Sequence, residues 1–150
     1  MSLADWLRPG WLTEHRTSAR EIADLLALVE RDLAASQTAN LDADWRLSIA
    51  YNAALQAATA ALVACGYRAT RESHHYRVLE SLAQTIGADA TLVQQLDQFR
   101  RKRNLGAYER AGLASSQEAE QMCALAAAVH DLVVAWLGRE HPLLLGKCTP

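Results

Sequence analysis

The sequence has few of the residues that build β-structure or hold metals. Aromatic residues make up only 6% of its 150 residues, and β-branched residues are few beside alanine and leucine. Its three cysteines, Cys65, Cys123 and Cys148, are widely spaced and form no CxxC pair. An odd number of isolated cysteines argues against a disulfide framework and against a zinc site. The composition therefore favours helix, and we expect no metal and no cofactor.

The motifs of several enzyme classes are also missing. The sequence contains no GxxxxGK[ST] loop, no GxGxxG, no HExxH and no GxSxG, which argues against an NTPase, a dehydrogenase, a zinc hydrolase and a serine hydrolase. Its first residues include an acid and no long apolar core, unlike a signal peptide. His130 and Asp131 interrupt the apolar stretch 124–137, so we expect no membrane span. A reducing cytoplasm is the expected location.

Charge is nearly balanced over the chain, at −2, but it is unevenly distributed. Residues 66–110 hold eight basic and five acidic side chains, whereas the segments on either side carry more acids than bases. The middle of the chain is therefore its electropositive part. This excess is modest, so it does not by itself establish nucleic-acid binding.

Apolar residues recur at spacings of three and four, the period of amphipathic helices. Ser18 and Glu21 have the spacing of a capping box, and the stripe after them predicts a helix ending near Asn40. Asp42 is expected to cap a second long helix that ends at Gly66. Two long helices joined by so short a link pack antiparallel. The expected core-facing stripe of the second helix contains Trp45, Ile49, Ala53 and Gln56.

Three further helices are predicted after a polar, basic connection at residues 67–72. They cover residues 73–87, 89–106 and 115–138, and no strand-like alternation appears anywhere. We therefore predict one all-α domain spanning the chain, an antiparallel up-and-down bundle of four to five helices. Its core is residues 17–138, with a short N-terminal lead-in and a frayed C-terminal tail. The many alanines predict close approach of the helix axes.

The apolar stripe of the predicted fourth helix ends in a charged residue. Leu96, Phe99 and Arg103 follow one another at spacings of three and four, so they share one helix face. Two interpretations stay open. Arg103 is a structural residue buried against a carboxylate or the end of another helix, or it contacts phosphate. An arginine suits the second task because its planar guanidinium bonds phosphate oxygens in pairs.

More polar residues gather at the same end of this helix. Arg100 and Asn104 lie beside Arg103, and Tyr108 lies one turn beyond Asn104. Asn104 offers a donor and an acceptor, and Tyr108 offers a hydroxyl and a stacking face. These four residues are therefore candidates for contacting RNA or a nucleotide.

Together these features resemble a known family. The long helix pair, the His74-His75 pair that opens the predicted third helix, and Arg103-Asn104 with Tyr108 are similar to the HEPN domain (higher eukaryotes and prokaryotes nucleotide-binding). HEPN domains are helical bundles that usually dimerise. Many are metal-independent endoribonucleases, including toxins paired with a nucleotidyltransferase-type antitoxin. The resemblance implies a homodimer that contacts RNA or a nucleotide, with His74 and His75 near the site, and a nucleotidyltransferase-type protein partner.

The HEPN motif ends in a histidine, and this chain departs from it there. Tyr108 stands where the histidine is expected. In the mechanism that the resemblance implies, the histidine activates the ribose 2′-hydroxyl and the arginine steadies the phosphate, which makes Arg103 and Tyr108 the expected catalytic residues. A tyrosine, with a pKa of about 10, is a poor general base at neutral pH, whereas a histidine, with a pKa of about 6.5, is suited to the task.

Three functions therefore stay open, and whether the chain is an enzyme is undecided. The favoured one is a HEPN-like module that binds RNA or a nucleotide without strong catalysis. The second is a metal-independent ribonuclease toxin that uses Tyr108 or one of His74 and His75. These two histidines point about 100° apart on a helix and cannot both face one site. The third is a non-enzymatic dimeric interaction module in which Arg103 is structural. We expect His130 to be a core histidine.

Overall fold

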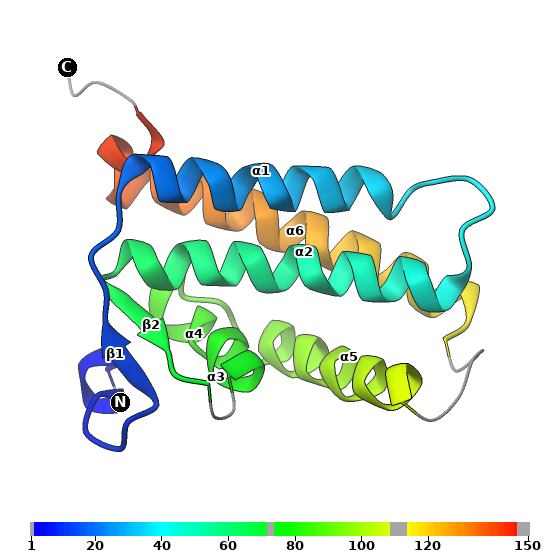
Figure 1. Cartoon of the computed structure of the whole chain (residues 1–150), viewed down its shortest axis with the longest axis horizontal. Helices are drawn as coiled ribbons and strands as arrows, with labels where there is room; N and C mark the ends of the chain where they lie inside the picture. The colour runs from blue at the N-terminus through cyan, green and yellow to red at the C-terminus, as the bar shows by residue number, and fades with distance from the viewer. Residues whose placement is uncertain (1, 72–73, 109–113, 147–150) are drawn as a thin grey trace.

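α-Helices make up most of the chain (Figure 1). The computed structural model describes residues 2–71, 74–108 and 114–146, with the side chains of 104–108 left out. The elements in chain order are η1 (Leu3–Trp6), β1 (Leu12–Glu14), α1 (Ala19–Ala35), α2 (Ala43–Ala64), β2 (Tyr67–Ala69), α3 (His74–Glu80), α4 (Leu82–Thr85), α5 (Ala90–Tyr108), α6 (Ser116–Glu140) and η2 (Pro142–Leu145). The predicted helical bundle is confirmed.

Side-chain caps fix where α1 and α6 begin. The backbone N–H of Glu21 donates to Ser18 Oγ at 3.1 Å, and Ser115 forms a full capping box with Glu118. The box at Ser18 is incomplete, because the Glu21 carboxylate accepts from Thr17 instead. Both starts agree with the sequence prediction.

Several helix ends differ from the prediction. α1 ends at Ala35 instead of near Asn40. Asn40 itself has a left-handed backbone conformation, with φ of 63°. Asparagine tolerates this conformation better than most residues, so Asn40 belongs to the turn. α5 stays helical through Gly106 as far as Tyr108, and α6 extends beyond residue 138.

α2 is the central helix of the bundle. It packs against α1 and α6 and also against the group formed by α3, α4 and α5 (Figure 1). Alanines fill much of its surface, and small side chains let neighbouring helix axes come close. The predicted stripe was wrong at Trp45, which is 64% exposed, and of its other residues Ala53 is buried whereas Ile49 and Gln56 are only half-buried. A helix that is buried around most of its circumference has no single apolar face for a periodicity to reveal.

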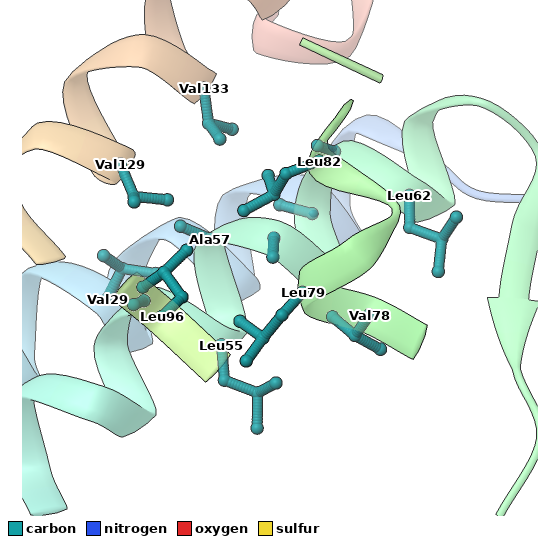
Figure 2. Close-up of a cluster of buried hydrophobic side chains, with 14 of the residues drawn as sticks. Val29, Leu55, Ala57, Leu62, Val78, Leu79, Leu82, Leu96, Val129 and Val133 are labelled. Carbon is teal, nitrogen blue, oxygen red and sulfur yellow. The ribbon is translucent and has the colours of Figure 1, made fainter. Parts of the chain in front are cut away.

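The hydrophobic core draws residues from all six α-helices (Figure 2). Leu79 and Leu82 enter it from the short α3 and α4, and Leu96 enters it from α5. All three side chains are almost fully buried. α5 is thereby anchored at its middle, one face turned toward α2.

Two short strands correct the expectation that the chain has none. β1 and β2 pair antiparallel, with Leu12 opposite Ala69 and Glu14 opposite Tyr67. Each strand has only three residues, which is too short for the alternation that identifies a strand in a sequence. The pairing ties the N-terminal segment to the connection after α2. The guanidinium of Arg77 then lies 3.4 Å from the ring centroid of Trp11.

Two of the helices, α2 and α6, are long and apolar enough to cross a membrane by length and composition. In α2, 67% of the most apolar window is buried inside the bundle, and in α6 the share is 39%. The core helix of a helical bundle has the same composition. The expectation of no membrane partner stays a prediction.

Candidate functional site

The basic end of α5 lies against α2 and α3. The guanidinium carbon of Arg103 lies 5.4 Å from the ring centroid of Tyr51 in α2. The hydroxyl of Tyr51 lies 3.4 Å from Nδ1 of His75 in α3. Three helices therefore contribute one residue each to a group that we call the Arg103 cluster: Arg103, Tyr51 and His75.

The apolar stripe of α5 explains why Arg103 lies in this position. Leu96 is fully buried and Phe99 is half-buried on the same helix face. Arg103 is the next residue of that stripe, so packing of the stripe against α2 carries its side chain onto the Tyr51 ring. A cation over an aromatic face is attracted by the ring quadrupole. The placement of Arg103 is thus set by core packing.

The neighbouring basic residues of α5 are already paired with carboxylates. Asp97 accepts from Arg100 Nε at 2.7 Å and from Arg101 at 3.0 Å. Lys102 forms an ion pair with Glu118 at the start of α6. Within the described residues, no carboxylate lies at ion-pair distance from Arg103. The structural interpretation, in which Arg103 pairs with a carboxylate, therefore finds no partner in the part of the chain that the structure describes.

The protonation states of the cluster follow from burial and from the positive charges around it. Burial lowers the pKa of His75, and the charges of His74, Arg103 and Arg100 lower it further. His75 is therefore neutral at pH 7 and can accept a proton or a hydrogen bond. Burial raises the pKa of Tyr51 to about 12. Its phenol stays protonated and can donate a hydrogen bond.

The two adjacent histidines have different surroundings, as their positions on one helix predict. Their ring centroids are 5.6 Å apart, in an edge-to-face arrangement. His75 contacts Tyr51 in the Arg103 cluster. His74 instead lines a pocket together with Arg68 and Glu21. The structure thus brings only His75 to the arginine.

Two of the predicted site residues, Asn104 and Tyr108, belong to α5, and their side chains lie outside the described part of the chain. Sequence reasoning also missed Tyr51, which contributes the ring under Arg103. A usable signal was present, because a tyrosine inside an alanine-rich buried helix needs a hydrogen-bond partner for its hydroxyl.

Expectations were also stated for metal sites, for the three cysteines and for His130. Among the described residues, no group of three or more His, Cys, Asp or Glu side chains could hold a metal ion. Cys123 is buried and Cys65 is half-buried, and Cys148 lies outside the described residues. His130, expected to be a core histidine, is half-buried inside α6, with its Nδ1 3.1 Å from Asp131 and its Nε2 3.8 Å from Glu30 of α1.

Acid is expected to destabilise the protein through His75. Its folded-state pKa is lower than the unfolded value, so the unfolded chain binds more protons in the range between the two. The stability contributed by neutral His75 is complete above pH of about 6.5 and is lost as the pH falls through its folded pKa. The free energy of unfolding is measured in urea at pH 7 and at pH 5. It should fall less between these two pH values for His75→Gln than for the wild type. Equal losses would show that His75 does not titrate abnormally.

The fold and the site define a helical bundle with a basic, partly buried cluster at the end of one helix. The chain belongs to the family called domain of unknown function (DUF8154), whose profile matches residues 48–144. No curated protein and no solved structure gives a significant match. The matched segment contains all three residues of the Arg103 cluster.

Proposed function

We propose that this protein binds RNA or a nucleotide through the Arg103 cluster, without strong catalysis. The observation that carries the proposal is an arginine with no carboxylate partner among the described residues. It lies at the end of a core-facing stripe, with its guanidinium carbon 5.4 Å from the centroid of the Tyr51 ring. The resemblance of Arg103-Asn104 and the long helix pair to HEPN domains supports the same assignment. An arginine that forms no ion pair within the described residues is available to bind an anion from outside the protein.

The chemistry of the cluster suits a phosphate joined to a ribose. Arg103 offers a planar fork of donors, and its contact with Tyr51 limits the conformations it must lose on binding. With the Nδ1–H of neutral His75 donating to the Tyr51 oxygen, the Tyr51 hydroxyl is free to donate to the ligand, and Nε2 of His75 is free to accept from a sugar hydroxyl. Arg100 adds positive charge nearby, although Asp97 compensates part of it.

A second candidate function is a metal-independent endoribonuclease, as in HEPN toxins. His75 favours this function, because it is neutral and would take the place of the missing motif histidine. It lies close enough to Arg103 for the positive charge of the arginine to lower its pKa. In that reaction His75 would accept the proton of the ribose 2′-hydroxyl while the 2′-oxygen bonds to phosphorus. The bond from phosphorus to the 5′-oxygen would break, and that oxygen would take a proton from water. This role would fall to His75 instead of Tyr108.

Two further proposals rest on the resemblance to HEPN domains: a homodimer, and a nucleotidyltransferase-type protein partner in a toxin–antitoxin system. A cytoplasmic location is proposed from the three widely spaced cysteines, which form no CxxC pair. The homodimer is the simplest to test. Light scattering at micromolar concentration should give twice the mass of the chain, and a monomer mass would reject it.

The test of the proposed function is a titration of a fluorescent single-stranded RNA with the purified protein in EDTA. The same samples are run on a denaturing gel. Saturable binding with intact RNA supports a binding module, whereas metal-independent cleavage supports the ribonuclease. If the RNA is neither bound nor cleaved and AMP, ATP and GTP also fail to bind, the proposal is wrong.

A further inference from the structure

A pocket of about 310 Å³ lies among α1, α2, α3 and β2, and it does not include the Arg103 cluster. Its size is at the lower end of the range for small-molecule sites, roughly 300–1,000 Å³. Most of its wall is apolar, formed by Leu25 from α1, Leu55 and Leu62 from α2, and Val78 from α3. The pocket therefore offers a compact hydrophobic wall to a ligand of a few carbon atoms.

Four titratable side chains are among the residues that line the same pocket. They are His15, Glu21, Arg68 and His74. They come from the segment before α1, from α1 itself, from β2 and from α3. The topology, and above all the pairing of β1 with β2, brings these distant parts of the chain around one opening.

The single carboxylate of this group is already occupied. Glu21 Oε1 accepts from Thr17 Oγ1 at 2.6 Å and lies 2.8 Å from His15 Nε2. These contacts lower the pKa of Glu21, so it stays ionised and engaged. Both contacts are to Oε1, so a ligand amine would have to bond Oε2, where the positive charges of Arg68 and of the amine repel each other.

Of the basic groups, His15 is bonded to Glu21, whereas Arg68 and His74 have no carboxylate within ion-pair distance among the described residues. The side chain of Arg68 is exposed, and its positive charge helps to lower the pKa of Glu21. His74 lines the pocket, and its one described contact is with the neighbouring ring of His75. An unpaired guanidinium beside an imidazole is a preferred partner of a carboxylate.

We propose that this pocket binds a small amphipathic carboxylic acid. Its apolar body lies on the wall of Leu25, Leu55 and Leu62, and its carboxylate bonds Arg68, with His74 as a second donor. This site is separate from the RNA or nucleotide site and does not depend on it.

Three ligands with the same six-carbon body separate the possible recognition modes: hexanoate, hexanamide and hexylamine. Binding is measured by calorimetry and by backbone amide shifts in ¹⁵N-labelled protein. The wild type should bind hexanoate about tenfold more tightly than hexanamide, because a charge-assisted hydrogen bond is stronger than a neutral one. The amide shifts should centre on the residues around Thr59 and Arg68.

Arg68→Gln should lower the affinity for hexanoate about tenfold and leave that for hexanamide unchanged. The matched control is Arg20→Gln, because Arg20 lies on α1 with a highly exposed side chain and does not line the pocket. Thr59→Leu fills part of the pocket and should weaken both ligands. The proposal is overturned if hexylamine binds most tightly, if the three ligands bind alike, or if none saturates at 20 mM.

Discussion

Replacing Arg103 with alanine is expected to lower the affinity for single-stranded RNA about 10- to 100-fold. Loss of a hydrogen-bonded charge from a phosphate contact has this magnitude. Arg103 is the basic residue of its α5 run that no carboxylate in the described part of the chain compensates, so its charge is available to the RNA. Fluorescence anisotropy of a labelled RNA at low salt measures the change. The slope of log affinity against log salt should also fall by about 0.7.

Arg101→Ala is the matched control for this substitution. Arg101 belongs to the same helix and the same basic run, but it is bonded to Asp97 and its side chain is 70% exposed. Its loss should change the affinity by less than about threefold, as expected of an exposed charge. Thermal unfolding separates binding from structure. If Arg103→Ala leaves the affinity unchanged but costs about 3–5 kcal/mol of stability, Arg103 is a structural residue.

Replacing Leu96 with alanine is expected to cost about 2–5 kcal/mol of unfolding free energy, the range measured for leucine-to-alanine changes in well-packed cores. Leu96 is fully buried and is the residue by which α5 enters the central core (Figure 2). The surrounding helices hold their positions through other contacts, so the space it leaves closes only in part. Urea unfolding monitored by circular dichroism measures the loss.

Leu132→Ala tests whether that cost comes from burial. Leu132 lies on α6 and is 48% exposed, so the same chemical change should cost less than about 1 kcal/mol. Because Leu96 also anchors the helix that carries Arg103, its loss should weaken RNA binding even below the unfolding transition. Similar stability losses for the two variants would mean that α5 is not docked through Leu96.

The sequence predicts the helices well because their signals are local. Ser18 and Ser115 mark two helix starts through hydrogen bonds to residues three positions later. Trp45 was placed wrongly because the face that a helix buries depends on its neighbours, and α2 has neighbours on nearly every side. The short strands β1 and β2 were missed for a similar reason. Their pairing joins residues 12–14 to residues 67–69, and a strand of three residues carries almost no pattern.

The candidate site was predicted only in its α5 part. Arg103 was found because it continues an apolar stripe, which is a property of one helix. Tyr51 and His75 reach it from two other helices, and their proximity depends on how α2, α3 and α5 pack. Adjacency on a helix predicted that only one of His74 and His75 could face the site. It could not predict which.

The central position of α2 bears on which part of this chain can fold alone. The family profile matches the chain from residue 48, inside a helix that begins at Ala43, and the match leaves out α1 and β1. Those omitted elements cover one side of α2 and hold one strand of the small sheet. The matched segment is therefore smaller than the bundle that this chain folds into. A fragment of this chain that begins at residue 48 would lack the first turn of α2 and would expose the side of α2 that α1 covers, so we expect it to be less stable than the whole chain.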